Sequence, residues 1–159
     1  MGCTRVAERV CAAVGLLAEA PSQFESAESV THGGVLWALP ALLANGLLPP
    51  ARLGFQLPKG FYSLIQVFLL LGYMALARIK TLEQLQYHPA GEWGKLLGLD
   101  RIPEVRTIRN KVKGLAVAAV VGAWGKVLSH AWMVQDPEAA GVLYVDGHVR
   151  VYHGAQTKL

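Results

Sequence analysis

Residues 91–113 read GEWGKLLGLDRIPEVRTIRNKVK, a stretch that combines three glycines and a proline with nine charged residues. Its glycines and Pro103 divide it into two short helices around a turn. After Pro103 the apolar residues return at helical spacing. They are Val105, Ile108, Val112 and Leu115. The sequence therefore predicts a helix-turn-helix-like segment over residues 88–116, with an amphipathic second helix and a turn longer than the usual three or four residues.

The face opposite these apolar residues is cationic. It carries Arg106, Arg109, Asn110 and Lys113 at spacings that place them on one side of a helix. The net charge of +4 lies in residues 78–114, which hold eight Lys and Arg against four Asp and Glu. Because Lys and Arg neutralise phosphates and Arg or Asn can bond base edges, this face is a candidate DNA-binding surface. A solvated face of an ordinary amphipathic helix is the alternative, and the pattern alone favours it.

The rest of the chain divides into an N-terminal, a central and a C-terminal part. Residues 1–32 are expected to form a helix, from about residue 4 to 18, and a polar connector. Residues 33–136 contain apolar helical runs, of which the one starting at residue 60 continues to residue 86 and is the longest expected helix. Within the C-terminal part, residues 137–159, the segments 142–145 and 149–152 alternate in the manner of strands around Asp146-Gly147 and predict a β-hairpin. The predicted fold class is mainly α, with a terminal hairpin.

Asp146 stands at the end of an apolar strand-like run, from which its carboxylate could reach the rim of a sheet. The following Gly147 gives it a simpler structural role, because Asp-Gly is a common hairpin turn. His148 and His153 lie nearby without a third ligand that would fix a metal geometry. The sequence contains no GxxxxGK[ST], GxGxxG, GxSxG or HExxH motif, so most nucleotide-binding and hydrolase classes receive no support.

Two of these segments resemble parts of bacterial DDE transposases. LYVDGHVRVYHG at residues 143–154 resembles the first acidic strand of their RNase H-like core. GEWGKLLGLDRIPEVRTIR at residues 91–109 is similar to the segment that precedes this core in insertion-sequence proteins. The resemblance runs from about residue 33 to the end and is strongest after residue 88. It implies a bacterial cytoplasmic protein in which residues 137–159 begin an RNase H-like catalytic domain.

The resemblance also implies a chemistry. In such a family three carboxylates hold two divalent metal ions, usually Mg²⁺, which activate water and a DNA 3′-hydroxyl for attack on phosphodiesters. Asp146 matches the first carboxylate and is the expected catalytic and metal-binding residue, whereas the second and third acids have no counterpart in the thirteen residues after it. We therefore expect a truncated transposase that retains DNA binding at most, holds no Mg²⁺ productively and cuts no DNA alone. Self-association is left open.

Two other classes of protein compete with this interpretation. Residues 29–51 and 60–77 contain no Asp, Glu, Lys or Arg, which suits a small multi-span membrane protein. Against this, Pro40 interrupts the first run and Gln66 dilutes the second. A stand-alone DNA-binding regulator would use the basic helix but would leave the C-terminal hairpin unexplained.

Overall fold

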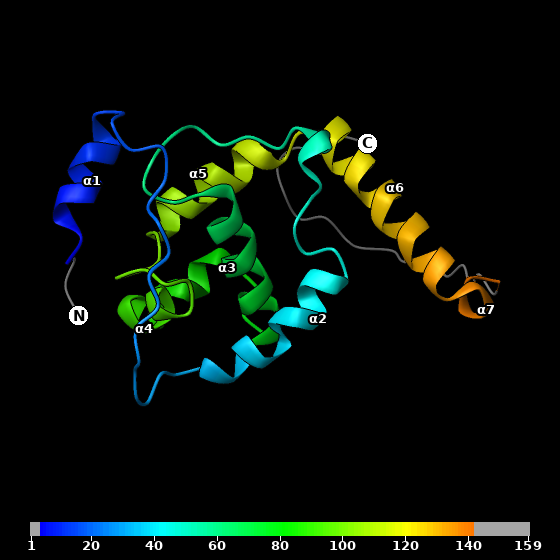
Figure 1. Cartoon of the computed structure of the whole chain (residues 1–159), viewed down its shortest axis with the longest axis horizontal. Coiled ribbons are helices and arrows are strands. Elements are labelled where there is room, and N and C mark those ends of the chain that lie inside the picture. The colour runs from blue at the N-terminus through cyan, green and yellow to red at the C-terminus, as the bar shows by residue number, and fades with distance from the viewer. Residues whose placement is uncertain (1–3, 142–159) are drawn as a thin grey trace, which may run out of the picture.

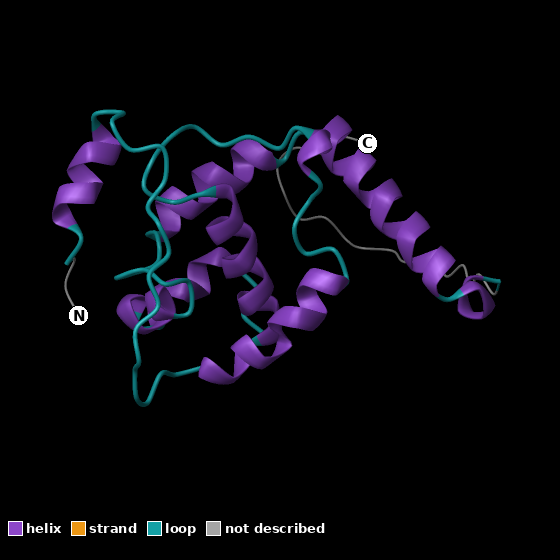
Figure 2. Cartoon of the chain, in the orientation of Figure 1, coloured by secondary structure: helices purple, strands orange, loops and turns teal. Residues whose placement is uncertain are grey.

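A computed structural model describes residues 4–141, and every regular element in that range is a helix (Figures 1 and 2). The elements in chain order are α1 Val6–Ala13, the 3-10 helix η1 Gly33–Ala38, α2 Leu39–Ala44, the 3-10 helix η2 Ala51–Leu53, α3 Leu64–Leu76, the 3-10 helix η3 Leu82–Tyr87, α4 Ala90–Lys95, α5 Val105–Leu115, α6 Ala118–Gln135 and α7 Pro137–Ala140. The predicted helical structure up to Asp136 is confirmed. The hairpin predicted after it lies outside the described residues.

The core is built around α3. Its side chains Leu70, Val67 and Tyr73 are at most 1% exposed. Residues from α4, from the connector that follows it and from α5 complete the same apolar cluster. They include Trp93, Leu96, Leu97, Leu99, Ile102 and Ile108. Burying a large apolar side chain contributes about 1.5 to 3 kcal/mol, so this cluster provides most of the driving force that holds the helices together.

A capping box fixes the start of α3. The Ser63 hydroxyl accepts from the Gln66 backbone N–H at 3.2 Å, and the Gln66 side chain accepts from the Ser63 N–H at 2.9 Å. The amide nitrogen of Gln66 also donates to the Ala20 carbonyl at 2.9 Å and to the Ser22 hydroxyl at 3.2 Å. Ser63 and Gln66 therefore begin the core helix, and Gln66, which weakened the membrane interpretation, also holds the N-terminal connector against it.

The predicted continuous helix from residue 60 to 86 is wrong, because α3 ends at Leu76. Arg78 adopts a left-handed conformation, with φ 58°. This conformation lets the N–H groups of Arg78 and Ile79 bond back to Ala75 and Met74, at 3.1 and 2.8 Å. The chain then reverses into η3, and α6, with 18 residues, is the longest helix among residues 4–141.

Glycines close three other helices in the same way, namely Gly15 after α1, Gly46 after α2 and Gly98 after α4, all with positive φ. Gly15 ends α1 at Ala13, so the first helix is shorter than the predicted helix to about residue 18. Gly46 ends α2 after Asn45, and the apolar run before it is divided between η1 and α2. Glycine is favoured at these positions because it carries no Cβ to clash in the left-handed region.

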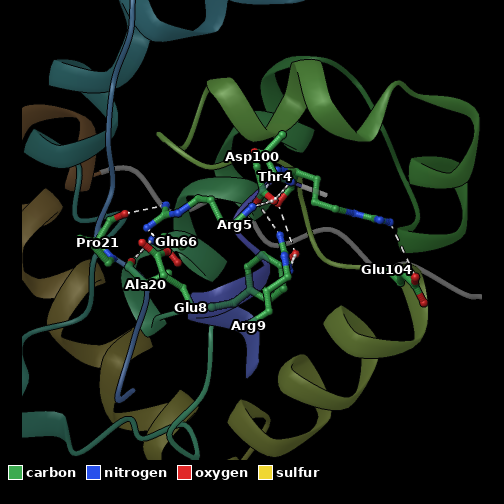
Figure 3. A network of polar contacts seen from close by, with 11 residues as sticks. Thr4, Arg5, Glu8, Arg9, Ala20, Pro21, Gln66, Asp100 and Glu104 are labelled. Carbon is green, nitrogen blue, oxygen red and sulfur yellow. Dashed lines mark hydrogen bonds and ion pairs between the residues drawn. The ribbon is translucent and has the colours of Figure 1, made fainter. Parts of the chain in front are cut away.

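The N-terminal segment is attached to the rest of the molecule through Asp100 (Figure 3). This carboxylate accepts from the backbone N–H groups of Thr4 and Arg5 at 3.1 and 3.2 Å, and from the Arg9 guanidinium at 2.5 Å. Arg9 also lies over the Phe61 ring, 3.8 Å from its centroid. Asp100 thus accepts from the N–H groups just before α1 and forms an ion pair with Arg9 of that helix.

α6 extends away from the other helices, as Figure 1 shows in yellow and orange. Its first half contacts the body of the protein, where Trp124 packs edge-on against Phe55 and Phe68. Residues 129–135 are all exposed. Within the described part of the chain no single helix is long and apolar enough to cross a membrane, and α5 with α6 meets those criteria only as a pair bent by 79°.

Candidate nucleic-acid interface

The amphipathic character predicted for α5 is present in the structure. Ile108 is 0% exposed and Leu115 is buried, while Val105 and Val112 are half-buried against the core. The opposite face is exposed and contains all four residues predicted from the sequence. They are Arg106, Arg109, Asn110 and Lys113. Because its other face is buried, α5 presents these side chains from a fixed backbone.

The connector before α5 determines where that helix lies. The Schellman turn at Gly98 ends α4, and the Ile102 N–H then donates to the Ala90 carbonyl at 3.0 Å, so the chain folds back along α4. The backbone passes so close that a Cβ on Gly94 would lie 2.5 Å from the backbone N and Cα of Arg101. Nine residues, 96–104, therefore return the chain to the start of α4 before α5 begins.

This arrangement gives the predicted two helices around a turn, but the turn is longer than the three or four residues of a helix-turn-helix. Among the described elements, η3 packs most extensively against α5, and it lies before α4 in the chain. Assignment to the helix-turn-helix motif therefore stays a prediction. The local unit that holds the cationic face is better described as η3, α4 and α5 with the connector 96–104.

Arg109 is engaged by an acid. Its Nη2 donates to Oε1 of Glu83, in η3, at 2.6 Å, and both side chains are 54% exposed. The hydrogen bond from Arg109 is the main reason that the pKa of the Glu83 carboxyl is below its usual value. Sequence analysis counted Glu83 only as one acid among many cations, because no helical spacing connects two residues 26 positions apart.

The other cations near α5 have structural roles. Lys111, which the predicted DNA-binding face omits, donates from Nζ to the Tyr62 carbonyl at 3.0 Å, and burial lowers the pKa of its ammonium group. Arg101 forms an ion pair with Glu104 at 3.6 Å. Lys111 thus ties α5 to the segment before α3, and the Arg101–Glu104 pair lies within the connector before α5. The exposed face is left to the four residues already named.

A cavity of about 550 Å³ lies beside the N-terminal segment, between α4 and the connector after α1. Its lining carries charges of both signs. The cations are Arg5 and Lys95, and the acids are Glu25, Glu28 and Asp100. In Asp100, burial opposes ionisation, yet the hydrogen bonds from Arg9 and from the backbone outweigh it and hold the pKa of this carboxyl below its usual value. A polyanion would meet three carboxylates here, so the cavity is a poorer DNA surface than α5.

The structure does not test the predicted metal site. Asp146, His148 and His153 lie outside the described residues. Within residues 4–141 no group of three His, Cys, Asp or Glu side chains is placed to hold a metal ion. His32 and His88 lie near each other, with ring centroids 5.6 Å apart, but they pack edge-on with each other and around Trp93 as part of an aromatic cluster.

Comparison with known proteins connects this geometry to a family. A family model described as "Transposase protein" matches residues 1–159. The chain belongs to this transposase family. No match was found among the curated proteins or among the solved structures.

Transposases act on DNA, so membership in the family supports a nucleic-acid partner in general. The family match covers the whole chain and includes every described helix. Family membership does not select a surface. Within the described part of the chain, α5 is the helix that joins a buried apolar face to an exposed face with three Lys and Arg side chains.

Proposed function

We propose that this transposase contacts DNA through the exposed face of α5, with Arg106, Arg109 and Lys113 near phosphates and Asn110 available to a base edge or a phosphate. The observation that carries the proposal is the burial of the other face, with Ile108 fully inside the core. A helix held in this way loses little further conformational freedom when it binds. The remaining cost is the ordering of the long exposed side chains.

Cation spacing along α5 suits a polyanion. Arg106 and Lys113 are seven residues apart, which corresponds to about 10 Å along a helix. Each contact between a cation and a phosphate releases condensed counterions, so binding weakens as salt rises. The family match and the exposed cations together favour a largely electrostatic interaction, in which Asn110 adds the capacity to hydrogen-bond.

A salt titration tests the proposal. We expect the double variant Arg106→Ala with Lys113→Ala to bind a DNA duplex more weakly, with a plot of log K against log salt that is shallower by about 0.9 for each lost contact. The matched control is Arg52→Ala with Lys59→Ala, which removes two exposed cations from outside α5. An equal loss in both double variants would show that net charge, rather than α5, governs binding.

We further propose that the family chemistry is of the DDE type, with Asp146 as the first metal-binding carboxylate and the bacterial cytoplasm as the location. The support is the resemblance of residues 143–154 to the first acidic strand of such enzymes. Within residues 4–141 no group of three His, Cys, Asp or Glu side chains is placed to hold a metal ion, and a two-metal site would need further carboxylates in addition to Asp146. We therefore derive no metal-dependent step from the described residues.

A nicking assay tests the role of Asp146. We expect the 159-residue polypeptide to leave supercoiled plasmid intact in Mg²⁺ or Mn²⁺, because one carboxylate cannot place two ions that each need several oxygen ligands at about 2 Å. Nicking that disappears in Asp146→Ala would contradict this expectation. Nicking that persists in Asp146→Ala would contradict the DDE role itself.

A further inference from the structure

The contact between Glu83 and Arg109 crosses from η3 to the cationic face of α5. The Arg109 Nη2 lies 2.6 Å from Glu83 Oε1, within the distance of a charge-assisted hydrogen bond. The two elements pack against each other, so the acid is carried by a neighbouring segment of the core unit. Glu83 is thus bonded to Arg109, one of the four side chains of the proposed DNA-binding face.

An ion pair this exposed contributes little to folding. Both side chains are 54% exposed, and exposed pairs are screened by water and salt. Its larger effect is on what else Arg109 can bind. A phosphate that approaches Arg109 must compete with a carboxylate that is held in place by the same fold.

The neighbouring charges make this competition specific to Arg109. Along the exposed face, Arg106 and Lys113 lie one turn to either side of it and carry the same charge as Arg109. A second ion pair within residues 4–141 lies near α5 and joins Glu104 to Arg101. Both of these residues precede the helix. Glu83 therefore engages Arg109 and leaves Arg106 and Lys113 accessible.

We infer that Glu83 restrains the proposed DNA surface by occupying Arg109, so that loosely bound DNA is held by Arg106 and Lys113 while Arg109 is withheld. This inference rests on the proposed function of α5. A restraint of this kind lowers affinity for phosphates in general and so works against non-specific binding, which is the repulsive part of specificity. DNA that places an acceptor well enough to displace Glu83 gains the third contact.

The test compares Glu83→Gln, Arg109→Ala, the corresponding double variant and the wild-type chain in binding to a duplex of mixed sequence at a series of salt concentrations. Glu83→Gln releases Arg109 and is expected to steepen the salt dependence by about 0.9, equivalent to about eightfold tighter binding at 0.1 M salt when binding is equal at 1 M. Arg109→Ala alone should change the slope little. Adding Glu83→Gln to Arg109→Ala should then have no further effect on the slope.

The charge control is Glu104→Gln, which removes one exposed acid beside α5 without touching Arg109. A slope that rises equally in Glu104→Gln, or that rises on Glu83→Gln even when Arg109 is Ala, would overturn the inference and assign the effect to net charge. An unchanged slope in Glu83→Gln would also overturn it. In each of these cases binding would still depend on Arg106 and Lys113. If binding did not depend on Arg106 and Lys113, the proposed function would have failed and the inference with it.

Discussion

Asp100 joins segments that are far apart in the sequence. Its side chain is 3% exposed and accepts from Arg9, 91 residues away, as well as from backbone N–H groups before α1. Tyr62 extends the network, because its hydroxyl donates to the Arg101 carbonyl at 3.3 Å and accepts from Arg9 at 3.1 Å. The ionised Asp100 carboxylate is therefore one of the contacts that attach α1 to the core.

The first prediction concerns that charge. Removing one partner of a buried ion pair leaves the other unpaired, so Asp100→Asn is expected to lower the free energy of unfolding at neutral pH by roughly 3 kcal/mol. The folded-state pKa of Asp100 is depressed, hence its contribution is present above the unfolded value of about 3.9 and is lost as the pH falls through the folded-state pKa.

Urea unfolding at neutral and acidic pH measures both effects. The gap in unfolding free energy between the wild type and Asp100→Asn should narrow as the pH is lowered below about 4. A gap that stays constant over this range would mean that the carboxylate charge does not hold α1 in place.

The second prediction compares two glycines. Gly98 has φ 67°, and a Cβ there would lie 2.8 Å from the Gln23 backbone nitrogen, which itself donates to the Gly98 carbonyl. Gly98→Ala is therefore expected to destabilise the fold by about 1 to 2 kcal/mol for the left-handed backbone alone, plus the cost of the clash. Gly114, inside α5, has open space around it, so Gly114→Ala should stabilise by about 0.5 to 1 kcal/mol. Thermal melting of both variants checks the opposite signs.

At the scale of elements, α3 is the helix whose buried side chains form the core together with those of α4, the connector after it and α5. It contributes side chains to the centre of the core, and its first turn also holds the N-terminal connector. Gln66 has both functions, since its side-chain oxygen caps the helix and its nitrogen binds the Ala20 carbonyl. A polar residue near the start of a core helix is thereby satisfied at both ends.

The third prediction separates these two functions. Ser63→Ala removes only the cap and should cost about 1 kcal/mol. Gln66→Ala also leaves the buried Ala20 carbonyl without this donor, which adds about 1 to 3 kcal/mol. Denaturant midpoints of the two variants provide the measurement, and equal losses would show that the bond to Ala20 contributes nothing.

At the scale of the whole molecule, stability is expected to be uneven. Figure 1 shows that α3 is surrounded by other elements whereas the far half of α6 extends outward. Residues 129–135 are exposed, and Val134 and Met133 are among the exposed large apolar side chains. Helical backbone with few tertiary contacts opens at lower free energy than backbone in the core.

Hydrogen exchange supplies the fourth prediction. Amides of residues 129–135 in α6 are expected to exchange faster than those of α3, because opening the end of α6 breaks almost no tertiary packing. The measurement is made on the full chain at a concentration low enough to disfavour self-association. Equal protection in both helices would show that the end of α6 is covered in solution.

Much of this organisation was accessible from the sequence. The helical class follows from apolar residues at helical spacing, and the division of α5 into a buried and a cationic face follows from the positions of Ile108, Arg106 and Lys113. The closing turn at Gly46 is likewise a local feature, since glycine is favoured where the backbone becomes left-handed. All of these depend on residues within a few positions of one another.

Tertiary structure alone decided the rest. Nothing local predicts that Arg78 would adopt a left-handed conformation and end α3, or that Arg9 would reach Asp100. Nor does any spacing rule pair Glu83 with Arg109, although that contact engages one cation of the exposed face of α5. The physical reason is that periodicity reports only which face of an element is apolar, whereas long-range ion pairs depend on how those faces pack, and packing is a property of the whole chain.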